Sequence, residues 1–242
     1  NNVHLASISG GTDIVSCFLL GNLYQSVKLG EIQNKGLALD VDIFDDKGSP
    51  LKNMKGELVC KNPFPSMPLK FWNDKNDKKY KEAYFNRFKN IWYHGDYAEA
   101  KSTGGFIIYG RSDTTLNPGG VRLGTAEIYS EVEKFKEIKE SIAVGQSWDN
   151  DVRVVLFVLM NKKYSLTEQL LTKLKLQIRI NVSPRHVPSK IISVKDIPRT
   201  KSGKIVELAV KNTIEGNIIK NKEALINPEV LRYFKNLTEL NY

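Results

Sequence analysis

The second half of the chain carries the clearest hydrophobic periodicity. Apolar residues recur at helical spacing from Ile128 to Ile138, behind a threonine, Thr125, that can cap a helix. A second apolar series, from Leu166 to Ile178, predicts another amphipathic helix. Between the two helices, SIAVGQ and VRVVLFVLM predict two strands, and the second is apolar enough to be buried on both faces.

The remainder of this half completes a small α+β domain. KIISV at 190–194 predicts a third strand, and a third helix is expected to begin near Lys204. The resulting order is helix, strand, strand, helix, strand, helix, and about a hundred residues can bury a core of their own. We therefore expect a domain over 113–220 and a separate short helical tail over 221–242.

The first half alternates over shorter stretches, which predicts strands and turns. LALDVDIF at 37–44 alternates apolar and polar positions, DDKGSP predicts a turn, and GELVC predicts the next strand. NPFPSMP at 62–68 is punctuated by proline and cannot lie in a central strand. KSTGGFIIYGRSD predicts the return strand of a hairpin. A mostly β domain is therefore expected over 1–112.

Composition narrows the class of protein. Of the 242 residues, 41% are hydrophobic and 26% are charged, which is typical of a globular chain. No apolar run reaches the roughly 18 residues of a membrane span, and the first residues lack the pattern of a secretory signal. Cys17 and Cys60 have no metal-like spacing, which favours a reducing compartment. We therefore expect a cytoplasmic protein; the absence of an initiator methionine indicates a piece of a longer one.

The net charge of +9 raises the question of a nucleic-acid partner. The lysines, however, alternate with acidic residues in NDKNDKKYKE and EKFKEIKE, as is typical of solvated helix faces. A small ligand that carries phosphates explains a positive surface equally well. Neither a nucleic-acid nor a membrane partner is expected.

Two stretches of the first half could carry chemistry. In SGGTD at 9–13, glycines let the backbone approach a ligand, Thr12 can bond a phosphate oxygen, and Asp13 can hold a hard cation. In WYHGD at 92–96, the carboxylate of Asp96 could accept both hydroxyls of a ribose. Taken alone, each stretch is read more simply as an ordinary turn.

Two further stretches lie near the expected domain boundary at residue 113 and beyond it. Arg111 and Arg122 bracket the segment Pro118-Gly119-Gly120, and guanidinium groups suit phosphate or ribose oxygens. IPRTKSGKI at 197–205 ends in a Gly-Lys pair but is no P-loop, because Pro198 stands where a glycine is required. An exposed surface turn is the simplest reading of Lys204 in isolation.

In their order along the chain, these motifs resemble those of the adenylate-forming superfamily of acyl-CoA synthetases, luciferases and peptide-synthetase adenylation domains. That family has a Thr-Glu or Thr-Asp segment, a GEL strand, an HGD or TGD turn, a GRxD hinge followed by GxR, and a PxTxSGK loop. This chain has GGTD, GEL, HGD, GRSD with GVR, and PRTKSGK in the same order. VRLGTAEI is particularly similar to the acetyl-CoA synthetase branch. SGGTDI, NPFPSMP, TLNPGGVR, GTAEIY and SPRHVP resemble members that activate acetoacetate.

The resemblance implies a nucleotide site in the first domain. Gly11 and Thr12 would face the α-phosphate and the adenylate, with Thr12 taking part in catalysis. Asp13 would help to hold Mg²⁺. Asp96 would bind the ribose of ATP, and Arg111 would contact the ribose and the phosphates.

The resemblance further implies that the second domain is a lid. Asp113 would be the hinge, Gly120 would line the tunnel for the pantetheine arm of CoA, and Arg122 would contact the phosphate region of ATP. Arg179 matches a CoA-contacting arginine of the acetyl-CoA branch. Lys204 would be the catalytic lysine of adenylation.

The fold implied is thus α+β, with the distal, mostly β part of a large AMP-binding domain followed by a small α+β lid. The implied activity is that of an ATP-dependent acid–CoA ligase, which converts acetoacetate, ATP and CoA into acetoacetyl-CoA, AMP and diphosphate through an acyl-adenylate. Acetate or propionate is the alternative acid, and a non-catalytic interaction protein is the alternative class. The family's phosphate loop and most of its N-terminal portion are not among these residues. That portion is an expected partner, and the 242 residues are expected to be inactive alone.

Overall fold

The computed structural model describes residues 3–219 and 222–242. The chain forms two compact units, Asn1–Ser112 and Asp113–Tyr242. The division falls where short alternating stretches give way to helical spacing and long apolar runs. The expected boundary between residues 220 and 221 lies outside the described residues, as do the first two residues of the chain. Among the described residues, no helix combines the length and the apolar character that a membrane span requires.

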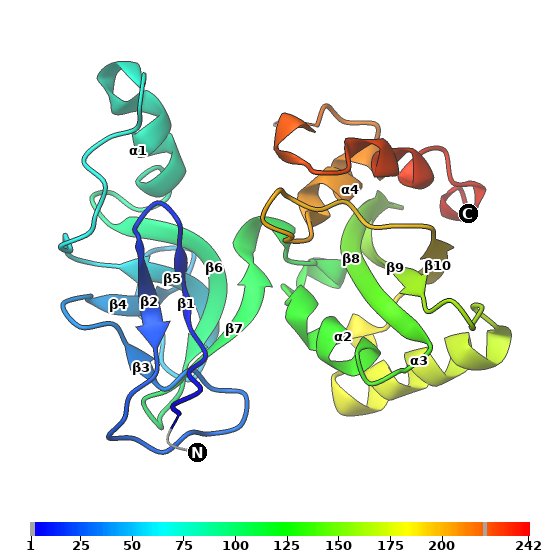
Figure 1. Ribbon diagram of the computed structural model, residues 1–242, viewed down its shortest axis with the longest axis horizontal. Helices are drawn as coiled ribbons and strands as arrows, with labels where there is room; N and C mark the ends of the chain where they lie inside the picture. Colours follow the sequence, from blue (N-terminus) through cyan, green and yellow to red (C-terminus); the bar gives the residue numbers. More distant parts are fainter. Residues whose placement is uncertain (1–2, 220–221) are drawn as a thin grey trace. The chain divides into compact units, whose positions relative to one another are not determined.

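The first unit is built largely from antiparallel β-structure (Figure 1). One sheet has the order β1-β2-β3 and the other the order β4-β5-β6-β7. The strands are β1 (Ser9–Gly11), β2 (Ser16–Leu20), β3 (Asn34–Lys35), β4 (Val41–Phe44), β5 (Lys55–Cys60), β6 (Trp92–Ala100) and β7 (Phe106–Arg111). Helix α1 (Lys78–Tyr84) follows the proline-rich loop, which is free of strand as expected. The hairpin return is confirmed as the pair β6–β7, whereas the strand expected over 37–44 begins only at Val41.

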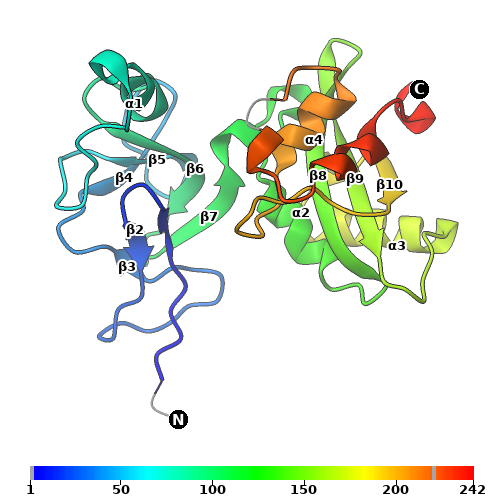
Figure 2. The ribbon, with the colours of Figure 1, turned by 45° about the horizontal axis from the view of Figure 1, so that its top comes forward.

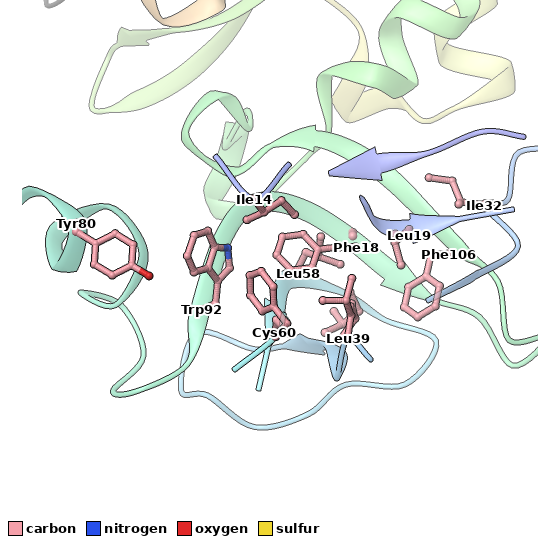
Figure 3. Close-up of a cluster of buried hydrophobic side chains, with 14 residues drawn as sticks. Ile14, Phe18, Leu19, Ile32, Leu39, Leu58, Cys60, Tyr80, Trp92 and Phe106 are labelled. Carbon is pink, nitrogen blue, oxygen red and sulfur yellow. The ribbon is translucent and has the colours of Figure 1, made fainter. Parts of the chain in front are cut away.

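The core of the first unit lies between its strands and α1. Phe18 of β2, Leu58 of β5 and Trp92 of β6 are almost completely buried, and Figure 3 shows their side chains close together. The indole of Trp92 meets Phe18 and Tyr80 at ring-centroid distances of 6.4 and 6.2 Å. A single large aromatic residue therefore joins the sheet to the helix.

The second unit has a three-stranded sheet with helices on both faces. Strand order is β10-β9-β8, with β8 (Ile138–Trp148) antiparallel and β10 (Lys190–Val194) parallel to the central β9 (Asp151–Met160). The helices are α2 (Thr125–Val132), α3 (Glu168–Asn181) and α4 (Glu207–Ile214). The expected order of helices and strands is confirmed, and Figures 1 and 2 show α3 and α4 on opposite sides of the sheet.

Strand β9 is buried on both faces, as its apolar run predicts. Alternate residues, among them Leu156, pack into a core with α2 and α3. The intervening residues, among them Phe157, pack with Val210 of α4 and with Phe234. Because side chains alternate across a strand, this one element supplies two separate cores.

A two-residue turn joins β8 to β9. Trp148 pairs with Asp151, and the residues between them, Asp149 and Asn150, have φ values of 49° and 59°. Left-handed conformations at both central positions define the turn type whose twist matches that of a hairpin. Aspartate and asparagine tolerate this backbone better than other non-glycine residues, so the local sequence suits the turn.

Two sequence expectations for this unit are wrong in detail. The first helix ends at Val132, not near Ile138, because Ile138 already pairs with Met160 in the sheet. The residue before the helix is Gly124, so Thr125 is its first residue and not its cap. The helical spacing continues by chance through the residues between the end of α2 and the start of β8, although they lie in a turn.

The end of the chain also differs from expectation, because residues 222–242 are not a separate tail. They form short 3-10 helices, the longest being Pro228–Phe234. Val230 and Phe234 from this segment are buried in the core beside Phe157. Apolar residues that look like a loose tail in the sequence therefore complete one face of the sheet.

Candidate active site

A bonded polar cluster lies where β1, β6 and β7 meet in the first unit. The carboxylate of Asp96 accepts hydrogen bonds from Ser9 Oγ at 3.3 Å and from Arg111 Nη1 at 3.0 Å. The same Nη1 donates to the carbonyl oxygen of His94 at 3.0 Å. The register of β6 and β7 pairs Asp96 directly with Arg111. The HGD and GRSD motifs, fifteen residues apart at these two positions, are therefore one structural feature.

The two side chains differ in their access to solvent. Asp96 is buried, whereas the Arg111 side chain is 50% exposed. The buried carboxylate holds the guanidinium in place, while the exposed part of the Arg111 side chain can be approached from solvent. A carboxylate beside a guanidinium can recognise hydroxyl and phosphate oxygens together, because the first accepts hydrogen bonds and the second donates them.

His94 packs closely against Gly11. A Cβ atom added to Gly11 would lie 2.7 Å from Cε1 of His94, so a glycine is required for the ring to fit. Trp92 Nε1 donates to His94 Nδ1 at 3.4 Å, which leaves the proton of the neutral ring on Nε2, 3.8 Å from Asp96 Oδ2. Burial lowers the pKa of His94 despite the opposing charge of Asp96, so the ring is neutral at pH 7.

Gly95 also makes room for the cluster. Its φ is +81°, a conformation that favours glycine, and a Cβ atom there would lie 2.6 Å from Nη2 of Arg111. The backbone conformation thus favours the glycine of the HGD motif, and its lack of a side chain leaves room for the arginine in this position.

Asp13 lies in the turn between β1 and β2 and is bonded to Tyr84. The hydroxyl of Tyr84 donates to the Asp13 carboxylate, and its ring stacks on Trp92 with 3.7 Å between centroids. Burial and the carboxylate of Asp13 raise the pKa of Tyr84, which keeps the hydroxyl protonated as a donor. Thr12 is exposed in the same turn, where its carbonyl oxygen accepts from the amide of Val15 at 3.1 Å.

The expected magnesium ligand is a single carboxylate. No group of three or more His, Cys, Asp or Glu side chains in the described part of the chain could hold a metal ion. Mg²⁺ is commonly bound through one or two carboxylates together with substrate phosphates. The exposed Asp13 fits that mode of binding and does not fit an all-protein cage.

Lys204 ends a tight loop of the second unit. The amide of Thr200 donates to the carbonyl oxygen of Lys204 at 2.8 Å, and Thr200 Oγ1 accepts from the amide of Lys204 at 3.1 Å. Gly203 closes the turn with a φ of +84°. The loop is further tied to the end of the chain, because the amide of Lys201 donates to the carbonyl oxygen of Ala224 at 3.3 Å, while the Lys204 side chain is exposed.

The remaining expected residues of the second unit lie on separate elements. Asp113 belongs to the short 3-10 turn Ser112–Thr114, and Gly120 to the turn Pro118–Gly120. Arg122 Nε donates to Thr115 Oγ1 at 3.0 Å, so its side chain is held against the start of the unit. Arg179 is exposed in the last turn of α3.

Thus the structure brings Asp96, Arg111 and Gly11 together around His94, and it ties Asp13 to the same region through Tyr84 and Trp92. Sequence reasoning missed Ser9 and Tyr84, since their partners lie 87 and 71 residues away. No local pattern signals contacts of that kind. His94 could have been found, because it belongs to a motif and adjoins the carboxylate.

No protein-family model matches the chain, but almost its whole length is similar to known proteins. It is 60% identical over 239 residues to "Acetoacetyl-coenzyme A synthetase" of Rhizobium meliloti (strain 1021), covering 99% of this chain and 37% of that protein. It is 46% identical over 242 residues to "Acetoacetyl-CoA synthetase" of Gallus gallus, covering 99% of this chain and 36% of that protein. The solved "Acetoacetyl-CoA Synthetase from Streptomyces lividans" superposes with a TM-score of 0.91 at 40% identity, covering 98% of this chain and 36% of that one.

The fold, the bonded motifs and these similarities define the class: the chain belongs to the adenylate-forming acyl-CoA synthetase family. The resemblance that the ordered motifs indicate is thereby confirmed. Within that family, the relatives that it matches are acetoacetyl-CoA synthetases. The chain spans slightly more than a third of their length.

Proposed function

We propose that the protein to which these residues belong is an ATP-dependent acid–CoA ligase that acts on acetoacetate. The observation that carries the proposal is the Asp96–Arg111 pair, which joins two family motifs into one bonded cluster. The similarity to acetoacetyl-CoA synthetases supports the choice of acid. Acetate and propionate are the alternative acids, and comparison of the three as substrates of the full-length protein distinguishes them.

The proposed chemistry has two steps. A carboxylate oxygen of the acid attacks the α-phosphorus of ATP, the bond to the bridging oxygen breaks, and diphosphate leaves. The sulfur of CoA then attacks the acyl carbon, the bond between that carbon and the AMP oxygen breaks, and the thiol proton passes to a base or to water. Adenylation is needed because AMP is a far better leaving group than oxide.

The residues of the first unit bind and orient the nucleotide in this proposal. Asp96 accepts hydrogen bonds from the ribose hydroxyls, and Arg111 contacts the ribose and phosphate oxygens. Thr12 and Gly11 face the α-phosphate, and Asp13 is the carboxylate for Mg²⁺. The bound magnesium ion would neutralise part of the phosphate charge. Tyr84 holds Asp13 in position through its hydroxyl.

In this proposal, some residues of the second unit act in adenylation and others act in the CoA step that follows. Lys204 places its ammonium near the negative charge that develops during adenylation, since a lysine provides a compact point charge on a flexible stem. Arg122 contacts the phosphates of ATP, whereas Gly120 and Arg179 serve the CoA step. Asp113 is the hinge between these two arrangements.

Substitution of Lys204 in the full-length protein tests this assignment. Lys204→Ala should slow adenylation, measured as ATP–diphosphate exchange, on the order of 10²–10³-fold, the usual effect of removing one stabilising donor. Thioester formation from supplied acetoacetyl-adenylate should be largely retained. The control is Lys201→Ala, which removes an exposed lysine of the same loop. Equal loss of both half-reactions in Lys204→Ala would contradict the assigned role.

We further infer that the 242 residues alone do not catalyse the reaction, because they span 37% of the Rhizobium relative. The family's phosphate loop is not among them. Formation of AMP from ATP and acetoacetate by the isolated chain would overturn this inference.

A further inference from the structure

A short loop of the second unit presents two glycines at its tip. Leu116 and Leu123 form its neck, with reciprocal amide-to-carbonyl hydrogen bonds of 2.9 and 2.8 Å. At the tip, Gly119 and Gly120 have φ values of +60° and +73°. No atom lies within 4 Å of a Cβ position on either glycine, so the tip is open on its outer side. Left unsupported, two such glycines would sample many conformations.

One side chain fixes this tip. Both carboxylate oxygens of Asp151 accept the amide hydrogen of Gly119, each at 2.9 Å. Asp151 is the first residue of β9 and pairs with Trp148 across the hairpin, so its backbone is set by the sheet. A hydrogen bond to a charged acceptor is roughly twice as strong as a neutral one. The conformation of the glycine tip is therefore tied to a rigid strand.

A second contact holds the far end of the same loop. The amide of Gly124 lies 3.4 Å from Glu127 Oε2, which is also 3.2 Å from Nε2 of the buried His186. The other ring nitrogen of His186 is 2.8 Å from Ser183 Oγ. The loop is thus anchored at its neck and beyond its C-terminal end, and Asp151 is the anchor at the tip.

We propose that Asp151 is a positioning residue for the thioester-forming step. It holds Gly119 so that the backbone of Gly120 keeps an open, reproducible surface for the pantetheine arm of CoA. This inference rests on the proposed function, which gives Gly120 its place in the CoA path. Asp151 acts through the loop and has no part in adenylation. Its substitution should therefore slow the CoA step and leave adenylation unchanged.

Kinetics of the full-length protein provide the first test. Asp151→Ala should lower kcat/KM for CoA on the order of 10-fold, because a small misplacement of a binding surface is costly to the reaction. ATP–diphosphate exchange should stay within about two-fold of the unsubstituted protein, because the adenylation residues are untouched. Asp151→Asn, which keeps one acceptor oxygen, should restore most of the CoA step. Equal loss of both half-reactions would overturn the proposal.

A charge-matched control is available in the same turn. Asp149 is exposed, and asparagine tolerates its left-handed backbone, so Asp149→Asn removes one charge without touching Gly119. Asp149→Asn should leave both half-reactions unchanged. A loss of the CoA step as large as that of Asp151→Ala would mean that local charge, and not the bond to Gly119, is responsible.

Hydrogen exchange tests the contact independently of activity. In the full-length protein, the peptide that contains Gly119 should exchange faster in Asp151→Ala than in the unsubstituted protein or in Asp149→Asn. Unchanged exchange would overturn the proposal even if activity fell. If the unsubstituted protein has no ligase activity, the proposed function fails, and the exchange rates still show whether Asp151 holds the tip.

Discussion

The two units hold their candidate residues in different ways. In the first unit, Asp96 is buried and bonded, and His94 packs against Phe18 with 4.7 Å between ring centroids. In the second unit, Lys204 is exposed on a loop whose hydrogen bonds involve its backbone and not its ammonium. Asp96 and His94 of the first unit are therefore part of its buried interior, whereas the Lys204 side chain of the second unit is not.

This difference teaches which residues can be changed without harming the fold. A residue that is bonded into a core contributes to stability and to binding together, so its substitution affects both. An exposed side chain that makes no hydrogen bond within its loop can be replaced with little effect on folding, because surface changes usually cost less than about 0.5 kcal/mol. Four substitutions test the comparison, from the largest expected effect on stability to the smallest.

Trp92→Ala should have the largest effect. Trp92 is 2% exposed, joins the sheet to α1 and carries the stacked ring of Tyr84. Loss of a buried aromatic side chain of this size costs about 3–5 kcal/mol. Urea unfolding followed by circular dichroism measures the change. The control is Trp72→Ala, since Trp72 is 92% exposed. Similar effects of the two substitutions would contradict the assigned core.

Glu131→Ala tests whether the second unit has a buried polar cluster of its own. The Glu131 carboxylate accepts from Lys134, Gln177 and Asn181 at 2.6, 2.9 and 2.9 Å. Its removal should destabilise the protein by about 1.5–3 kcal/mol, the range for hydrogen bonds to charged groups. Glu133→Ala, which changes an exposed neighbour, is the control and should have little effect.

The effect of Glu131 should also depend on pH. Burial raises the pKa of this carboxyl, but the hydrogen bonds from Lys134, Asn181 and Gln177 outweigh burial and hold it below the usual 4.5. Because the folded pKa is depressed, the stabilisation is complete above the unfolded value and is lost as the pH falls through the folded one. The difference in stability between Glu131→Ala and the unsubstituted protein should therefore shrink in acid. A difference that stays constant down to the acid transition would contradict the assignment.

Gly11→Ala should have a smaller effect, caused by overlap with the ring of His94. Overpacking of this kind costs about 1–3 kcal/mol. The double substitution Gly11→Ala, His94→Ser removes the obstructing ring and should be less destabilised than the sum of the two single changes. Thermal unfolding of all four proteins gives the coupling between the two sites. Strict additivity would show that the two residues do not constrain each other.

Lys204→Ala should change stability least. The side chain is exposed, and the loop keeps its hydrogen bonds from Thr200 and Gly203. The midpoint of urea unfolding should stay within the equivalent of about 0.5 kcal/mol. A larger loss would mean that the ammonium helps to hold the second unit together, and the comparison between the units would then fail.

The elements that the sequence predicts well are those with long or distinctive local patterns. The apolar run of β9 gave both its place in the sheet and its burial on two faces. The limits of elements were less predictable: the spacing that includes Ile138 fits a helix, but pairing with Met160 draws that residue into β8. Tertiary pairing decides such boundaries, and one sequence does not display it.

In the candidate site, too, some features could be predicted from the sequence and others could not. The motif residues were identifiable because their order resembles a family, and the register of β6 and β7 then places Asp96 beside Arg111. The bonds from Ser9 and Tyr84 could not be predicted, since each joins segments more than seventy residues apart. Gly11 was expected to admit a ligand, and the structure adds that it admits the ring of His94.

The turn at Asp149 and Asn150 has a consequence for insertions and deletions. Side chains of β9 alternate between two cores, so a shift of register by one residue would send Leu156 and Phe157 to each other's side. Because only two residues connect the strands, the turn cannot take up an inserted or deleted residue, and the strand could do so only by forming a bulge. Changes in length are thus far more restricted at this turn than changes in side chain, and the fixed length keeps Asp151 opposite Trp148.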